Sequence, residues 1–460
     1  MPADIRPPNI LVILPHDLGT CLNCYGQEVV TSPNLDRLAG QGARLVNFFA
    51  TAPECTPSRA GLFTGQYTHQ NGLMGLCHRG WSFKRNVRHL AQALQDRGYG
   101  TYLFGMQHET QDDPTWLGYQ HIDRDPCQLS GPVSERVCRF LQQPDLGQPW
   151  FVHAGFIDVH RSMGWPARSD FDPAAIVLPG YLPDTTAVRA EFCRYYQAIK
   201  NMDAAVGRMV DQLDTAGQAE NTLIVFVSDH GSPFPGAKST LYDAGLRVAC
   251  VVRWPGHIAP RQAPANLLSN IDLYPTILEA CDAPIPPDIA GRSFLPLLCG
   301  RSYAQRDCVF GTFYYDAAYD PMYCVRTGRF KYIRSFAPTF AQVPDLPPQM
   351  AAPRHTGRWI RGGDTDVQLS AAWEAMHGVD GRVPPEELYD LEQDPQEQHN
   401  LVGMPNYAAV LVEMRGRLRE MMCTTESPLS TGHIPPSLSS SGNRPIRLSG
   451  NGAGDESVIP

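Results

Sequence analysis

The residues best suited to chemistry lie directly after short apolar runs. His16-Asp17 follows one such run and Asp229-His230 follows another. A single pair of this kind is more often a loop turn with a hydrogen-bonded carboxylate. Two pairs at separate strand ends favour a site for a divalent cation, because buried carboxylates and imidazoles need a compensating positive charge. The sequence therefore predicts that both pairs contribute ligands to one metal ion.

Three further polar residues, His108, Asp158 and His160, also follow apolar runs. If these runs are parallel strands of one sheet, their carboxyl ends meet at one edge and bring the polar side chains together. The alternative for His108 and His160 is a structural role as buried histidines. Their position after separate strands favours a shared site.

Cys55 begins the segment Cys-Thr-Pro-Ser-Arg-Ala-Gly-Leu-Phe-Thr-Gly, which ends at Gly65. Pro57 suits the first turn of a helix that runs to about Phe63, which places Cys55 beside the helix N-terminus and Arg59 one turn later. Such a position lowers the pKa of a thiol and gathers positive charge for an anionic substrate. Taken alone, a cysteine at a helix start is more often an inert, packed thiol.

The elements that must position these residues alternate between strands and helices. Nearly continuous apolar runs are typical of strands buried on both faces. Such runs occur at Asn9–Leu14, Thr101–Phe104, Trp150–Val152 and Leu223–Val227. Helical patterns lie at Ser32 to about Gly40 or Gly42, Asn86–Arg97 and Glu191–Leu213. The alternation predicts an α/β domain over residues 1–302, with a doubly wound, mostly parallel sheet flanked by helices.

The pattern of a smaller α+β domain follows, which we assign to residues 303–425. Val325–Ile333 predicts a hairpin around Thr327-Gly328, Leu388–Leu391 a short strand and Tyr407–Met421 a helix. These elements predict a domain built on a short antiparallel sheet. Residues 426–460 are rich in Ser, Pro and Gly without hydrophobic periodicity, so we expect a disordered tail.

The composition of the 460-residue chain restricts its class. The net charge of -9 is spread without a basic stripe, which argues against a nucleic acid partner. The sequence shows neither a membrane span nor a signal peptide, so we expect a cytoplasmic protein with no membrane partner. The 13 cysteines are scattered, which favours reduced thiols. Cys21 and Cys24 form a C-x-x-C pair without a second pair, which favours two packed thiols over a zinc site.

The segment that begins at Cys55 resembles the signature of the sulfatase family, Cys-x-Pro-Ser-Arg followed by Thr-Gly. Other stretches resemble the family in the expected order. They are Pro8-Asn9-Ile10, Ser32–Leu38, His69-Gln70-Asn71-Gly72, Ser228-Asp229-His230-Gly231, Arg253-Trp254-Pro255-Gly256, Asp272–Thr276, Glu387–Leu391 and Asp394-Pro395. The resemblance spans residues 8 to about 420 and implies an enzyme that hydrolyses sulfate esters or sulfamates.

The resemblance implies that a formylglycine-generating maturation enzyme oxidises Cys55 to formylglycine. The hydrate of formylglycine carries two hydroxyl groups on one carbon, of which one attacks sulfur and the other later expels sulfate. The family also implies one divalent metal ion, usually Ca. Its ligands at the matching positions are His16, Asp17, Asp229 and His230.

The family further implies roles for four residues around the nucleophile. Arg59 would hold and polarise the formylglycine hydrate, and Lys238 would bind a sulfate oxygen. His108 and His160 would contact the sulfate or protonate the leaving group. Cations and a metal stabilise the charge that builds on the sulfuryl oxygens, while an acid assists departure of the leaving group.

Three positions depart from the family pattern. His16-Asp17 stands where many sulfatases have Asp-Asp, and Asp229-His230 stands where they have Asp-Asn. Two imidazole ligands favour Mn, Fe or Zn over Ca, unless either histidine lies beside the ligands instead of among them. Met106 occupies the place of a family Lys, which removes one contact to the nucleophile or the sulfate.

Within the family the chain resembles the sulfamidase, or heparan N-sulfatase, branch. The parallels are His69–Leu76, Leu182–Thr185, Ser232–Pro235 and Leu241-Tyr242. The branch implies a small sulfated substrate, a sugar such as N-sulfoglucosamine. We assign His69, Asp158, Tyr315 and Asp316 as candidate substrate-binding residues, since an aromatic surface and a carboxylate suit a sugar or an amine. Gly311–Asp316 nevertheless lacks the His-rich sequence of a close sulfamidase.

Two other functions are alternatives. A phosphodiesterase or phosphonate monoester hydrolase is one, because relatives of this fold pair the same nucleophile with His-containing metal sites. A catalytically weak binding homologue is the other, and the loss of the family Lys at Met106 motivates it. A chain that had lost catalysis would have little reason to keep the whole maturation signature, so this alternative ranks last.

Overall fold

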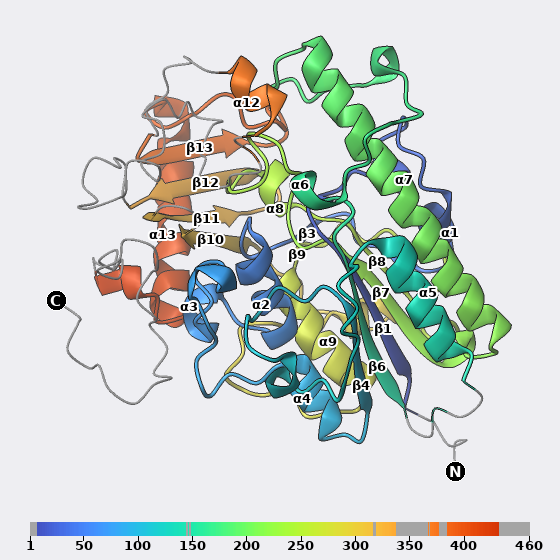
Figure 1. The fold of residues 1–460 in the computed structure, drawn as a ribbon. Helices are drawn as coiled ribbons and strands as arrows, with labels where there is room; N and C mark the ends of the chain where they lie inside the picture. Colours follow the sequence, from blue (N-terminus) through green and yellow to red (C-terminus); the bar gives the residue numbers. More distant parts are fainter. Residues whose placement is uncertain are drawn as a thin grey trace.

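The computed structural model describes residues 7–143, 146, 149–315, 319–336, 367, 369–376 and 384–431. These residues form a large α/β part and a smaller antiparallel sheet that lies beside it (Figure 1). Asp316 and residues 432–460 of the predicted tail lie outside the described residues.

The large sheet has seven strands in the order β2-β8-β7-β1-β6-β4-β5. Its members are β1 (Asn9–Pro15), β2 (Ala43–Arg44), β4 (Gly100–Gly105), β5 (His121–Ile122), β6 (Trp150–Phe156), β7 (Thr222–Val227) and β8 (Cys250–Arg253). β8 runs antiparallel to both of its neighbours, whereas β7, β1, β6, β4 and β5 run parallel. The predicted doubly wound, mostly parallel sheet is thus confirmed.

Strand β1 shows why the apolar runs do not alternate with polar residues. Ile10, Val12 and Leu14 belong to one hydrophobic core, and Leu11 and Ile13 belong to the core on the other face. Because helices cover both faces of a parallel sheet, every position of its central strands is buried.

Two layers of helices cover the sheet (Figure 1). α1 (Pro33–Gln41), α5 (Ser130–Leu141) and α7 (Thr186–Thr215) pack on one face, and α2 (Cys55–Thr64), α4 (Leu90–Gln95) and α9 (Leu273–Ala280) pack on the other. The helix predicted at Glu191–Leu213 is therefore the inner part of α7. The helix predicted at Asn86–Arg97 is shorter, because His89 caps its start by accepting a hydrogen bond from the N–H of Ala91.

The smaller sheet has four antiparallel strands in the order β10-β11-β12-β13. They are β10 (Val309–Tyr315), β11 (Tyr319–Arg326), β12 (Phe330–Ser335) and β13 (Glu386–Asp390). α13 (Ala408–Thr424) packs against this sheet through β11 and β12. The predicted hairpin around Thr327-Gly328 joins β11 and β12, so the small antiparallel domain is confirmed.

The first residues of the predicted tail are folded, which corrects its starting point. Pro428–Thr431 form a short 3-10 helix, and Leu429 is buried. Ser427 is buried as well, with its Oγ atom 2.6 Å from the hydroxyl of Tyr323 on β11. The polar, Ser-rich composition gave no signal of this contact, because the partner residue Tyr323 lies in β11, far away in the sequence.

A buried charge cluster, Asp243-Lys331-Glu397, joins the two sheets. Lys331 on β12 is fully buried, with its Nζ atom 2.7 Å from Asp243 and 3.1 Å from Glu397. Asp243 begins α8 (Asp243–Leu246), which follows the chain segment that carries Lys238. Burial raises the pKa of Glu397 to about 7, whereas Lys331 and Arg326 lower the pKa of Asp243 to about 2 against the effect of burial.

Among the described residues, every helix is too short or too polar to cross a membrane.

The carboxyl ends of β7, β1, β6 and β4, which are neighbours in the sheet, meet at one edge. Ligand sites of open α/β sheets lie beyond that edge.

Candidate active site

Helix α2 places Cys55 at its first position, as the sequence predicted. All ten residues of α2 are buried, which is unusual for a helix of a soluble protein. The helix ends at Gly65, whose N–H bonds to the carbonyl of Gly61 and whose φ of 69° suits a residue without a Cβ atom. Cys55 is therefore held on an enclosed helix.

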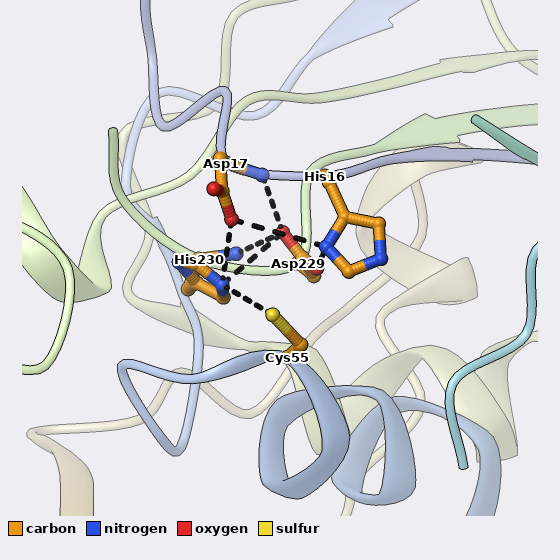
Figure 2. A group of neighbouring side chains, drawn as sticks. All are labelled: His16, Asp17, Cys55, Asp229 and His230. Atoms are coloured by element: carbon orange, nitrogen blue, oxygen red, sulfur yellow. Dashed lines mark hydrogen bonds and ion pairs between the residues drawn. The ribbon is translucent and has the colours of Figure 1, made fainter. Parts of the chain in front are cut away.

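Five side chains converge in front of that helix (Figure 2). One ligand atom from each of five residues lies within 4.8 Å of the others; the residues are His16, Asp17, Cys55, Asp229 and His230, and all are buried. His16-Asp17 follows β1 and Asp229-His230 follows β7, so the two pairs come from adjacent strands. The structure thus brings together the two predicted pairs and the cysteine.

Asp229 is the centre of the hydrogen bonds in this cluster. Its Oδ1 atom accepts hydrogen bonds from the N–H groups of Asp17 at 3.0 Å and His230 at 2.9 Å. Its Oδ2 atom accepts one from Nε of Arg59 at 3.1 Å. Asp17 holds a left-handed backbone conformation with φ of 53°, which costs free energy for a residue other than Gly and is typical of functional sites.

The two histidines of the cluster differ in their partners. His230 bonds through Nδ1 to the carbonyl oxygen of Gly231 at 3.0 Å, which leaves Nε2 facing Asp17 at 3.1 Å and the sulfur of Cys55 at 3.2 Å. Binding of one ring nitrogen to a backbone carbonyl is how proteins orient a histidine whose other nitrogen holds a metal. His16 has its Nδ1 atom 3.2 Å from Oδ2 of Asp229.

Two cations balance the carboxylates. Lys238 donates a hydrogen bond to Oδ2 of Asp17 at 3.2 Å, and Arg59 donates to Asp229 and to the carbonyl of Gln107. Arg59 is fully buried and Lys238 nearly so. Both cations therefore lie where an anionic group would meet little competition from water.

The electrostatics of the cluster keep its ligand atoms available. Burial would raise the pKa of Asp17, but Lys238 and His160 hold it well below its usual value. Burial and the nearby Arg59 lower the pKa of His16 to about 3, so this ring is neutral at physiological pH. For His230, the carboxylates of Asp229 and Asp17 outweigh burial and raise the pKa, so this ring must lose a proton when it binds a metal. Asp17 and His16 are already in the forms that bind metals, an ionised carboxylate and a neutral imidazole.

The expected low pKa of Cys55 is wrong for this structure. Burial raises the pKa of the thiol well above its usual value, although Lys238 acts in the opposite direction. The helix start contributes partial positive charge, but a thiolate there would also lie near two carboxylates in a site without water. An unmodified Cys55 would therefore be a poor nucleophile.

The residues present fit a divalent metal ion. Neither ring nitrogen of His16 has a hydrogen-bond partner among the described residues, and Oδ1 of Asp17 also lacks one. Buried polar atoms without partners cost free energy, and a cation that they coordinate removes this cost. The donor set of two carboxylates and two imidazoles suits a first-row transition metal better than Ca, which prefers oxygen ligands alone.

The predicted histidines after β4 and β6 line one side of the cluster. The rings of His108 and His160 each lie 5.6 Å from the ring of His16, measured between centroids. Burial, with His16 as the next cause, lowers the pKa of His108 well below its usual value. His108 has φ of 59°, a second left-handed residue at this edge.

The three candidate substrate-binding residues that the structure describes have partners outside the cluster. Asp158 accepts hydrogen bonds from the N–H and Oγ of Ser130 at the start of α5. His69 is within hydrogen-bonding distance of Thr425 and stacks on Tyr67, and Tyr315 packs on Trp81 with ring centroids 5.0 Å apart. Their assignment to substrate binding stays a prediction, as does that of Asp316 outside the described residues.

One residue near the site was missed by the sequence analysis. His78 lies in the 3-10 turn Cys77–Arg79 and stacks on His108, with an angle of 4° between the rings. No apolar run precedes His78, so the strand-end argument gave no signal for it. A histidine in a Gly-bounded turn has no pattern that separates it from a surface residue.

The doubly wound sheet carries at its carboxyl edge a buried group of carboxylates and imidazoles that could hold a metal ion, beside a cysteine at a helix start, which is an arrangement suited to a hydrolase. The sequence profile of the sulfatase family matches residues 8–283, so the chain belongs to the sulfatase family. The profile of the N-sulphoglucosamine sulphohydrolase C-terminal domain matches residues 236–346. The resemblance seen in the sequence is therefore confirmed.

One curated relative resembles the chain in sequence, and two solved structures resemble it in fold. Human N-sulphoglucosamine sulphohydrolase is 29% identical over 486 residues, covering 92% of this chain and 91% of the relative. A solved enzyme in complex with its substrate D-glucosamine-2-N,6-O-disulfate has a TM-score of 0.68 at 18% identity, covering 93% of this chain and 100% of that one. The phosphonate monoester hydrolase of Agrobacterium radiobacter has a TM-score of 0.70 at 20% identity, covering 91% and 96%.

Proposed function

We propose that this sulfatase hydrolyses a sulfate ester or sulfamate of a sugar, with residue 55 as the nucleophile after conversion of its thiol to formylglycine. The observation that carries the proposal is the arrangement around Cys55. Its sulfur lies at the start of α2, within 4.8 Å of carboxylate and imidazole atoms that suit a cation, and Arg59 and Lys238 bind the same carboxylates. Positive charge therefore surrounds the position where a sulfuryl group would react.

Different residues of the chain would contact the sulfuryl oxygens and the leaving group. Arg59 and Lys238 face the negative charge that grows on the sulfuryl oxygens, and both are already oriented by carboxylates, so little reorganisation is needed. His108 and His160, on the opposite side of His16, contact the sulfate or the leaving group. The buried walls of α2 exclude water other than the reacting molecule.

His16, Asp17, Asp229 and His230 would hold the divalent ion. When bound, such an ion supplies positive charge that stabilises anionic oxygens and favours ionisation of a hydroxyl group. The two imidazoles support Mn, Fe or Zn as its identity.

The sugar substrate is supported by the relatives. The human relative is named for N-sulphoglucosamine, and a solved structural neighbour binds a disulfated glucosamine. The match of residues 236–346 to the C-terminal domain of the former enzyme extends this support into the smaller sheet. We therefore propose an N-sulfated or O-sulfated glucosamine as the substrate class.

A cytoplasmic location and a maturation enzyme as partner belong to the same proposal. The thirteen cysteines are all free of disulfide bonds, which suits a reducing compartment. The segment around Cys55 supports recognition by a formylglycine-generating enzyme, because it carries the family signature.

The test combines mass and activity. After coexpression with a formylglycine-generating enzyme, the peptide that contains residue 55 should be about 18 Da lighter, the result of exchanging a thiol for an aldehyde. Cys55→Ala should abolish hydrolysis of a sulfated glucosamine and of an aryl sulfate, whereas Cys281→Ala, an equally buried cysteine at the end of α9, should not. Full activity of unconverted protein would overturn the proposal.

A phosphonate monoester or phosphodiester hydrolase is the second candidate, and the two histidines among the metal ligands favour it. Rates on a sulfate ester and on the matching phosphate diester, measured with one enzyme preparation, separate the candidates. A higher kcat/KM on the phosphodiester would replace the first proposal with the second.

A further inference from the structure

His108 is the most accessible part of the site. Of the nine predicted catalytic and metal-binding residues, eight are buried and His108 alone is partly exposed. Its Nε2 atom lies 3.2 Å from Nδ1 of His78, and the two rings are stacked with centroids 5.4 Å apart. Substrate that reaches the cluster past His108 therefore also meets His78, a residue that the proposed function does not use.

Thr56, the second residue of α2, ties these two histidines to the nucleophile helix. Its hydroxyl donates to the carbonyl oxygen of His108 at 2.7 Å and accepts a hydrogen bond from the N–H of Cys77 at 3.2 Å. The turn that carries His78 and the loop that carries His108 are thus fixed to the same side chain. These hydrogen bonds therefore fix the position of His78 relative to His108.

The hydrogen bond between the rings determines which nitrogen of His108 is free. A neutral imidazole has one donor and one acceptor nitrogen. Nε2 is taken by His78, while Nδ1 of His108 is buried and has no hydrogen-bond partner among the described residues. If His78 donates to Nε2, the proton of His108 stays on Nδ1, and this N–H can donate a hydrogen bond to a substrate oxygen.

A groove continues outward from the two histidines. Its volume is about 440 Å³, within the range of sites for small ligands, and both His78 and His108 line it. The lining also includes Asp123, Asp125 and Arg124, and it contains no Phe, Tyr or Trp.

The polar side chains of the groove are held in place by neighbours. Asp123 and Asp125 lie 2.5 and 3.6 Å from Arg136, and Arg124 lies 2.8 Å from Asp113. Carboxylates and a guanidinium fixed in this way suit the hydroxyl and amine groups of a sugar better than an aromatic ring.

We propose that this groove binds the leaving-group sugar of the substrate, and that His78 at its inner end is a positioning residue that fixes the tautomer of His108. The inference rests on the proposed function, because a leaving group exists only if the chain hydrolyses an ester or sulfamate. It adds to that function a place for the sugar beside β4 and β5.

The variants His78→Phe and His78→Asn separate the hydrogen bond from the stacking. His78→Phe keeps a flat ring but loses the donor, and we expect kcat on both a glucosamine N,O-disulfate and 4-nitrophenyl sulfate to fall about tenfold. His78→Asn replaces the donor and should recover most of kcat. Two-bond proton–nitrogen spectra of the holoenzyme should show the Nδ1-protonated tautomer of His108, lost in His78→Phe and regained in His78→Asn.

Arg124→Met tests the groove itself. Because Arg124 is 65% exposed, its loss should leave folding intact. We expect KM for the glucosamine disulfate to rise at least fivefold, and to rise more than KM for the small aryl sulfate. Arg88→Met is the matched control, since Arg88 is also exposed and paired to an aspartate but lies outside the groove.

The outcomes distinguish this inference from the proposed function. If the wild-type chain hydrolyses neither sulfate, the proposed function fails. If it hydrolyses both, while His78→Phe and Arg124→Met leave kcat and KM within twofold, the groove and the role of His78 are refuted and the proposed function stands.

Discussion

Removal of the ammonium group from the Asp243-Lys331-Glu397 cluster should destabilise the protein in a pH-dependent way. Lys331→Met leaves two buried carboxylates without their shared cation, and breaking a buried ion pair in this manner costs about 3–5 kcal/mol of unfolding free energy. Asp243 keeps Arg326 at 3.4 Å as a weaker partner. The loss should therefore come mainly from Glu397, whose carboxylate lies 3.1 Å from the ammonium group of Lys331.

The sign of the pH dependence follows from the raised pKa of Glu397. Its pKa is about 7 in the folded chain against an ordinary 4.5, so the folded state holds a proton that the unfolded state releases. This contribution, about 3 kcal/mol, is present below pH 4.5 and is lost as the pH rises through 7. In Lys331→Met the full cost should appear near pH 8 and fall to roughly half near pH 5.5, where Glu397 is protonated.

Urea unfolding followed by tryptophan fluorescence measures this difference. Lys200→Met is the matched control, because Lys200 is 41% exposed and its ion pair with Asp170 at 2.9 Å should contribute less than about 1 kcal/mol at either pH. Equal losses for Lys331→Met at both pH values, or a loss below about 1 kcal/mol near pH 8, would refute the reasoning.

Three further predictions concern the site. Chelation should lower the thermal midpoint as well as the activity, because an ion present at 100 times its Kd contributes about 2.7 kcal/mol, and re-addition of Mn or Zn should restore both; an unchanged midpoint would argue against a metal in the cluster. Met106→Lys should raise kcat on an aryl sulfate by adding a cation next to Gln107, whose carbonyl oxygen accepts a hydrogen bond from Arg59, whereas the exposed Met163→Lys should not; equal effects would dismiss a specific contact. Asp158→Asn should cost about 1 kcal/mol of stability through its bonds to Ser130 and leave KM unchanged, and a raised KM without lost stability would return Asp158 to substrate binding.

The strands that position the site could be predicted because burial on both faces leaves a clear signature. β1, β4, β6 and β7 all appear as apolar runs, and their parallel pairing follows from the helices between them. β8 was missed. It has only four residues, and its hydrophobicity carries no signal that it runs antiparallel to β7. Hydrophobicity shows that a strand is buried, but it does not show which way the strand runs.

For the site as well, features that depend on local sequence could be predicted, and features that depend on the whole fold could not. The strand-end argument located His16 and Asp229, and the family signature located Cys55 and Arg59, because each depends on local sequence. The pKa of Cys55 was missed because burial, a property of the whole fold, outweighs the helix start. His69 shows the same limit: its partner Thr425 lies 356 residues away, and no local pattern records such a contact.

Complete enclosure of α2 fixes when residue 55 can be modified. An enzyme that oxidises this thiol must hold several neighbouring residues, yet in the finished protein Leu62, Phe63 and the rest of the helix are inside the core. Exposing them would cost about 1.5–3 kcal/mol for each large side chain, so the helix seldom opens. If residue 55 is converted as proposed, the burial of α2 favours conversion before the helix folds into the core, and the yield of converted protein would then depend on the relative rates of oxidation and folding.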